Sequence, residues 1–281
     1  MARPQDGGGP EEILEREEGA AVQRLRAASG TRAGETVEPQ VWEEGKPFPG
    51  GYTIDDKGPA LETAHNWRVA GSIWTDGSRL DSGAVGAACA WQTREGWTGG
   101  RFHLGTNKEV FDAEFHAIYQ ALKIFEERGQ SGRKYTIFSD CQPAIRRALS
   151  DTLGPGQQWA RAIIEAATRL IGCNNEVLIL WVPAHAGVRG NEIVDGMAKE
   201  AVAGQVYGVP DQVRWQASLP HLIRRATERR SETTAQWVRD YVRPERRYAP
   251  RGPRFSEEGA AKSAKGYRPT LLLAVVRTRS D

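Results

Sequence analysis

The sequence predicts a mixed α/β fold in which three antiparallel strands are followed by alternating helices and strands. Two observations lead to this prediction. Three strand-like segments follow one another closely after Trp67, with only glycine and mostly polar turn residues between them. Beyond them, amphipathic helical stretches alternate with two further strand-like runs, an order that places helices against a sheet. We therefore expect a mixed five-stranded sheet with helices on both faces.

The first three strands are expected to form an antiparallel meander. They are predicted over residues 68–76, 84–92 and 97–104, where β-branched, aromatic and small apolar residues dominate. The connections hold only a few residues, which is too short for a parallel crossover. Asp76 is unexpected in the first strand, because burying an unpaired carboxylate in apolar surroundings is costly.

The stretch after the meander predicts the strongest helix in the chain, over residues 108–129. Its large apolar residues recur at helical spacing and form one stripe: Phe111, Phe115, Ile118, Leu122 and Phe125. The strand "KYTIFSD" follows, then two helices in "CQPAIRRAL" and "GQQWARAIIEAATRLIG". The continuous apolar run "EVLILWVP" is typical of a strand covered on both faces, and "NEIVDGMAKEAVAG" predicts a last helix.

Composition divides the chain into three segments. Residues 1–66 are rich in Gly, Pro and Glu and are predicted to be linker-like or poorly ordered, apart from a helical candidate over Glu11 to Ala28. Residues 67–205 carry the predicted domain, and residues 206–281 form a basic, Arg-rich, partly helical segment. The whole chain has a formal charge of +2, but residues 221–281 alone carry +8. That excess is compatible with a solvated surface or with a segment that binds phosphates.

The sequence argues against a membrane protein. Its longest apolar stretches, "VLILWV" and "LLLAVV", are far shorter than the roughly 18 residues that a membrane span needs. The N-terminus has no apolar signal core. Three cysteines, an odd number without metal-ligand spacing, predict reduced thiols in an intracellular protein, nuclear or cytoplasmic.

Four acidic residues stand where a charge is locally unfavourable. Asp76 lies inside a strand, Glu114 at the margin of the apolar helix stripe, Asp140 at a strand end and Asp195 beside apolar residues of the last helix. Each alone has an ordinary alternative, such as an N-cap, an exposed turn or a partner for an arginine. Together they suggest hard oxygen ligands for Mg²⁺ or Mn²⁺, and two such ions can clamp a phosphodiester. His185, in a glycine-containing loop before Asp195, is a candidate proton carrier.

Four blocks in the chain together resemble the type 1 ribonuclease H family. They are "TDGS", "DAEFHAI", "FSDCQ" and "WVPAHAGVRGNEIVDGMAKEA", which occur in the family's order and cover about Trp67 to Ala203. The resemblance implies the ribonuclease H-like fold and cleavage of the RNA strand of RNA–DNA hybrids. It also implies two Mg²⁺ ions, with Mn²⁺ as a possible substitute, and products with 3′-hydroxyl and 5′-phosphate ends.

The resemblance also implies roles for single residues. The family's four catalytic and metal-binding acids correspond to Asp76, Glu114, Asp140 and Asp195. Its loop histidine, which assists proton transfer and product release, corresponds to His185. The substrate-binding positions correspond to Gly77 and Ser78, whose main chain would approach the RNA, and to Gln142, which would lie at the minor groove of the hybrid.

The sequence departs from the family pattern at two places. Many members carry an asparagine three or four residues before the helix glutamate, where this chain has Phe111 and Val110. Glycine is frequent at the position of Ala184, and if that residue needs a positive φ, alanine costs about 1 kcal/mol there. Neither departure removes a metal ligand.

The motifs look most like the ribonuclease H domains that end fungal non-LTR retrotransposon polyproteins. No separate hybrid-binding module and no reverse transcriptase palm are recognisable beside them. One alternative is a catalytically decayed retroelement fragment that keeps only nucleic-acid binding. Another keeps the fold but changes the chemistry, as in an integrase or a 3′–5′ exonuclease. The oligomeric state does not follow from the sequence.

Overall fold

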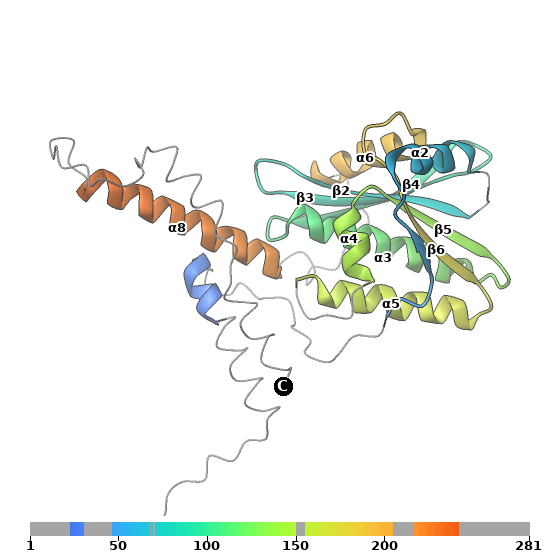
Figure 1. The fold of residues 1–281 in the computed structure, drawn as a ribbon, viewed down its shortest axis with the longest axis horizontal. Helices are drawn as coiled ribbons and strands as arrows, with labels where there is room; N and C mark the ends of the chain where they lie inside the picture. The colour runs from blue at the N-terminus through green and yellow to red at the C-terminus, as the bar shows by residue number, and fades with distance from the viewer. Residues whose placement is uncertain are drawn as a thin grey trace, which may run out of the picture. The chain divides into compact units, whose positions relative to one another are not determined.

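The computed structural model describes residues 23–30, 47–67, 69, 71–149, 155–204 and 216–241. These residues belong to two compact units, shown in Figure 1. The first unit contains the described residues from 47 to Leu222. The second contains residues 23–30 together with the chain from Ile223 onward.

The first unit is built on a mixed sheet. Strands β2 (Ser72–Arg79), β3 (Val85–Gln92) and β4 (Trp97–Gly105) pair antiparallel, as predicted. Strands β5 (Lys134–Ser139) and β6 (Glu176–Trp181) add in parallel on the other side of β2. The order across the sheet is β1-β6-β5-β2-β3-β4.

The sheet has six strands, so the predicted number of five is wrong. The additional strand β1 (Gly51–Thr53) pairs parallel with β6, with Tyr52 opposite Ile179. Helix α2 (Lys57–Asn66) follows it, so the linker-like prediction is also wrong for residues 51–66. The strand is three residues long and its partner lies far along the chain, so no local pattern marks it. The helix buries only Ala60 and Ala64 and therefore lacks a large apolar stripe.

Helices cover both faces of the sheet, as the sequence predicts (Figure 1). Helices α3 (Val110–Arg128), α4 (Gln142–Ala148) and α5 (Gln157–Gly172) lie on one face. Helices α6 (Arg189–Val202) and α2 lie on the other. Successive side chains of β2 point to opposite faces of the sheet, and each face carries its own hydrophobic core. Ile73 belongs to one core, and the next residue, Trp74, belongs to the other.

Helix α3 owes its position to the predicted apolar stripe. Four of the five stripe residues are fully buried, namely Phe115, Ile118, Leu122 and Phe125. Burial of a side chain of this size contributes about 2 kcal/mol, so the stripe fixes which side of the helix faces the sheet. The helix begins with a capping box between Glu109 and Asp112 and ends at Gly129, whose φ of 59° suits glycine.

Helix α6 approaches the sheet closely because two positions lack a side chain. A Cβ on Gly190 would lie 2.2 Å from the ring of Trp74, and a Cβ on Gly86 would lie 2.6 Å from the backbone nitrogen of Val202. Neither neighbour can move aside without disturbing the packing. The two glycines thus let the helix that carries Asp195 lie directly against β2 and β3.

The basic C-terminal segment is helical from Leu219 to Tyr241. Helix α8 (Leu219–Tyr241) begins in the first unit and continues into the second. Within the second unit, Arg225 donates a hydrogen bond to the carbonyl of Gly30, just beyond the helical residues 23–29. The rest of the predicted helix over Glu11 to Ala28, and residues 242–281, lie outside the described residues. Among the helices described, none is both long and apolar enough to cross a bilayer.

Candidate active site

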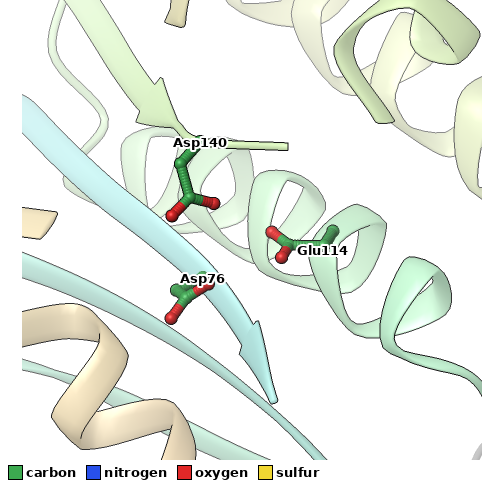
Figure 2. Close-up of side chains that lie close together, drawn as sticks. All are labelled: Asp76, Glu114 and Asp140. Atoms are coloured by element: carbon green, nitrogen blue, oxygen red, sulfur yellow. The ribbon is translucent and has the colours of Figure 1, made fainter. Parts of the chain in front are cut away.

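Three acidic side chains from three different elements meet at the end of β5. Asp76 comes from β2, Glu114 from the first turns of α3, and Asp140 directly follows β5 (Figure 2). Each offers one carboxylate oxygen, and these oxygens all lie within 4.8 Å of one another. The structure therefore brings together three of the four acids that the sequence singled out.

The pairing of the strands explains how a carboxylate can stand inside β2. The ladder between β2 and β5 ends at Thr75 opposite Ser139, so Asp76 is the first residue of β2 without a partner on β5. The register is held by a buried hydrogen bond of 3.0 Å from Thr75 Oγ1 to the carbonyl of Phe138. Asp140 is the next residue after β5, so it lies beside the end of this ladder.

Gly77 explains how Glu114 reaches the same place. A Cβ at this position would lie 2.8 Å from the backbone nitrogen of Glu114 and 2.9 Å from the Cβ of Ala113. The glycine therefore permits the close approach of α3 to β2. Its N–H also donates a hydrogen bond of 2.8 Å to Asp76 Oδ1, which orients that carboxylate.

Burial and neighbouring charges raise the pKa values of all three carboxyl groups. Burial, reinforced by the charge of Asp140, raises the pKa of Asp76 to about 7. Burial and the charges of Asp76 and Asp140 raise the pKa of Glu114 well above its usual value. Burial likewise raises the pKa of Asp140, although a hydrogen bond of 3.0 Å from Asn191 Nδ2 acts against the shift. The ionised forms of these acids therefore repel one another where the three side chains meet.

A divalent cation fits this arrangement. All three donors are carboxylate oxygens, the ligands that hard divalent cations prefer. Among the described residues, the buried Glu114 Oε2 has no hydrogen-bond partner. A positive charge between the three groups would satisfy that oxygen and offset the cost of holding three carboxylates together away from water.

Asp195 is part of α6 and lies beside the three clustered acids. Its charge raises the pKa values of both Asp76 and Asp140, which places it close to them. Its side chain is 24 % exposed, and Oδ2 accepts a hydrogen bond of 2.7 Å from Lys199 Nζ, one turn further along the helix. Of the four predicted acids, it is the one whose carboxylate is held by a cation of the chain itself.

His185 lies in the loop between β6 and α6 and is exposed. Its charge lowers the pKa of Asp140, so the ring stands near that carboxylate. The backbone at His185 has a φ of 50°, and Gly187 has a φ of 75°. The left-handed conformation therefore falls on His185 and not on Ala184, where the sequence suggested it. For a non-glycine residue it costs on the order of 1 kcal/mol.

The predicted substrate-binding residues lie within two positions of the clustered acids along the chain. Ser78 continues β2 after Gly77, and Gln142 is the first residue of α4, two positions after Asp140. Both side chains are partly exposed. Their contacts with nucleic acid, and those of the Gly77 main chain, stay predictions.

Asn191 is a site residue that the sequence reasoning missed. It is buried on the first turn of α6 and holds Asp140 through its side-chain N–H. A usable signal existed, because Asn191 precedes Asp195 by four residues, the spacing that puts two side chains on one helix face. An asparagine is uncharged, so it did not stand out among the acids.

A comparison with protein families finds that residues 69–203 match the model of the RNase H family. This part of the chain is an RNase H domain. The matched range contains all four predicted acids and His185. The fold class predicted from the sequence is confirmed, with six strands in place of five, and so is the enzyme class, a ribonuclease H.

Two solved structures are similar to the RNase H domain. RNase H1 from the archaeon Halobacterium salinarum is 19% identical over 47% of this chain and 96% of its own, with a TM-score of 0.37. The N-terminal RNase H domain of a Mycobacterium tuberculosis protein, solved as a fusion with maltose-binding protein, is 15% identical over 48% of this chain and 95% of its own, also with a TM-score of 0.37. A search of curated proteins finds no match.

Proposed function

We propose that this chain hydrolyses the RNA strand of RNA–DNA hybrids with the help of two Mg²⁺ ions, for which Mn²⁺ could substitute. The observation that supports this proposal most directly is the convergence of Asp76, Glu114 and Asp140 within 4.8 Å inside an RNase H domain. Their raised pKa values indicate a site that requires a compensating positive charge.

The acids of the domain would divide the two ions between them. Asp76 would contact both, Glu114 and Asp140 would complete the ligands of one, and Asp195 would complete those of the other. When bound, the ions would lower the pKa of an attacking water and stabilise the leaving oxygen. Asp195 would have to exchange its hydrogen bond with Lys199 for this role, and the 59 % exposure of the Lys199 side chain allows that movement.

The remaining predicted residues would handle protons and substrate. His185 is exposed in the loop before α6, and we assign its imidazole the role of proton carrier. Gly77, Ser78 and Gln142 lie on the two segments that flank the acids, β2 and the start of α4. We place the minor groove of the hybrid along them, because 2′-hydroxyl groups there distinguish RNA from DNA.

The proposal includes an origin and a location. The sequence motifs support descent from a retroelement, of the kind in which an RNase H domain accompanies a reverse transcriptase. The described cysteines, Cys89, Cys141 and Cys173, form no disulfide, which suits an intracellular compartment, nuclear or cytoplasmic.

A second candidate function is nucleic-acid binding by a fragment that has lost catalysis. The feature that favours it is the abundance of basic residues on α8, which include Arg224, Arg229 and Arg230. The cluster of buried acids argues for the enzyme, since a relic gains nothing from carboxylates that repel one another.

Cleavage of an end-labelled RNA–DNA hybrid by the full chain tests the proposal. We expect the RNA strand to be cut in Mg²⁺ but not in EDTA, while single-stranded RNA and duplex DNA stay intact. Asp140→Asn should abolish cleavage because it removes a charged metal ligand, and circular dichroism should show an unchanged fold. A folded wild-type chain that binds the hybrid without cutting it would favour the second candidate, and full activity of Asp140→Asn would disprove the site assignment.

A further inference from the structure

A short segment beyond the RNase H match packs as part of the same compact unit. The match ends at residue 203, whereas the first unit continues to Leu222. Within residues 217–222, five side chains are buried: Ala217, Ser218, Leu219, His221 and Leu222. These residues are as buried as those of the hydrophobic core, although they lie outside the matched domain.

Ser218 binds the start of α3 at two points. Its N–H donates a hydrogen bond of 3.0 Å to the carbonyl of Asn107, in the connection that precedes the helix. Its hydroxyl donates a hydrogen bond of 2.5 Å to Oδ2 of Asp112, whose side chain is fully buried in the first turn. The same Oδ2 accepts a hydrogen bond of 2.7 Å from the N–H of Glu109, so one carboxylate oxygen joins Ser218 to the helix cap.

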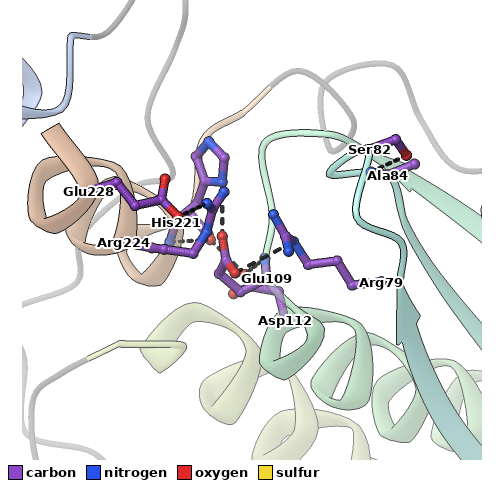
Figure 3. A network of polar contacts seen from close by, with 9 residues as sticks. Arg79, Ser82, Ala84, Glu109, Asp112, His221, Arg224 and Glu228 are labelled. Carbon is purple, nitrogen blue, oxygen red and sulfur yellow. Dashed lines mark hydrogen bonds and ion pairs between the residues drawn. The ribbon is translucent and has the colours of Figure 1, made fainter. Parts of the chain in front are cut away.

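His221 extends this network to β2. Its Nδ1 lies 3.0 Å from Oε1 of Glu109, and Oε2 of Glu109 lies 3.6 Å from Nε of Arg79 at the end of β2 (Figure 3). The side chains of Glu109 and Arg79 are 15 % and 24 % exposed, so solvent screens their interaction only in part. The start of α8, the cap of α3 and the end of β2 are therefore connected through polar side chains.

We propose that Ser218 and His221 are positioning residues for Glu114. They bind residues at the cap and in the first turn of α3, and Gly77 of β2 contacts the same turn within a space that admits no Cβ. Glu114 follows Asp112 by two residues, so a shift of that turn moves its carboxylate relative to Asp76. The kinetic part of this inference rests on the proposed function, whereas the anchoring of the helix does not.

The experiment compares variants of the full chain in two measurements. Ser218→Ala removes the hydroxyl that bonds to Asp112, and Ser218→Thr keeps a hydroxyl. His221→Ala removes the contact with Glu109 and provides a second variant should changes at Ser218 prevent folding, which the melting temperature would reveal. Ser231→Ala, an exposed serine on the same helix, is the matched control.

The first measurement is hydrogen exchange at the amides of Asp112 and Ala113, which bond to the carbonyl of Glu109. The second is the separate determination of kcat and KM on the hybrid. In Ser218→Ala we expect the two amides to exchange at least tenfold faster. We also expect kcat to fall about tenfold to hundredfold while KM stays within twofold of the wild-type value, because small misplacements of a catalytic group lower turnover more than binding. Ser218→Thr should recover most of both values, and Ser231→Ala should equal the wild type.

Different outcomes overturn different parts of the inference. Unchanged exchange in both Ser218→Ala and His221→Ala would disprove the anchoring. Faster exchange with unchanged kcat would disprove the positioning role, as would an equal loss in Ser231→Ala. If the wild type cuts no hybrid, the proposed function fails, and positioning is then judged by calorimetric Mn²⁺ binding. Weaker binding by Ser218→Ala than by Ser231→Ala would support it, and equal binding would refute it.

Discussion

Asp76 shows how a single residue can oppose the stability of the strand that holds it. The side chain is 6 % exposed, and burial with the nearby charge of Asp140 raises its pKa to about 7. A carboxyl group whose pKa is higher in the folded chain than in the unfolded chain binds its proton more tightly when folded. Its contribution to stability is therefore full below about pH 4 and is lost as the pH rises through about 7.

Replacement of this carboxylate should stabilise the metal-free protein while abolishing catalysis. In EDTA at pH 8 we expect Asp76→Asn to raise the free energy of unfolding by about 1–4 kcal/mol, the range that a shift of this size allows. Scanning calorimetry measures the change as a rise in Tm of several degrees. Asp81→Asn, at an exposed position of the same hairpin, should leave Tm nearly unchanged. A lower Tm for Asp76→Asn would contradict the electrostatic explanation.

Metal binding should depend on pH for the same reason. A cation competes with protons for Asp76, Glu114 and Asp140, and the pKa values of all three are raised, so its affinity should increase as the pH rises from 6 to 8. We expect an increase of at least tenfold in the Mg²⁺ association constant, with proton release that is largest near pH 6. Isothermal titration calorimetry in buffers of different ionisation enthalpy measures both quantities. A flat profile would mean that the three carboxyl groups are already ionised at pH 6.

At the level of elements, the site depends on the distance between β2 and α3. Asp76 and Asp140 are fixed by the strand ladder, which ends at Thr75 opposite Ser139. Glu114 has no such ladder, so its place follows from helix packing and from the absence of a side chain at Gly77. The contact between these two elements is therefore the part of the site that a single methyl group can disturb.

Gly77→Ala should damage the site more than the stability. The new Cβ would lie 2.8 Å from a backbone nitrogen, which cannot rotate away, so α3 must move outward. We expect a loss of about 1–3 kcal/mol in stability, typical of overpacking, together with a fall in kcat of about a hundredfold. Urea unfolding and initial-rate kinetics measure the two effects. Gly172→Ala at the end of α5, where a Cβ meets nothing within 4 Å, is the control and should be neutral or slightly stabilising.

For the whole molecule, the charge distribution separates a catalytic part from a basic part. Residues 221–281 carry a net charge of +8, while the chain as a whole carries only +2. Clustered arginines attract polyanions over distances of about a Debye length, and such binding weakens as salt rises. The arginines of this segment are therefore expected to influence how the enzyme associates with its substrate and not how it cleaves it.

Arg230→Ala tests this division of roles. The residue is exposed on α8, and its loss should raise KM for the hybrid severalfold while kcat stays within twofold. The slope of log KM against log salt should become shallower by about one, as expected for a single lost phosphate contact. Glu232→Gln on the same helix should change KM in the opposite direction, if at all. An unchanged KM and salt slope in Arg230→Ala would indicate an ordinary solvated side chain.

Much of the fold was predictable because local burial leaves a periodic trace in the sequence. The stripe from Phe115 to Phe125 marked α3, and the apolar run of β6 marked a strand covered on both faces. The clustered acids were recognisable because a charge among apolar residues is costly wherever the chain places it. The three-residue strand β1 left no such trace, since its ladder depends on β6 and not on its own side chains.

The sequence by itself thus determined the fold class, the order of most elements and the acids of the site. Only the tertiary structure decided which of these groups meet, because their contacts join segments far apart along the chain. It placed Asp76, Glu114 and Asp140 together, and it joined Ser218, which lies beyond the matched domain, to Asp112. A periodic pattern reports the burial of a residue, whereas the partner in a contact is set by how whole elements pack.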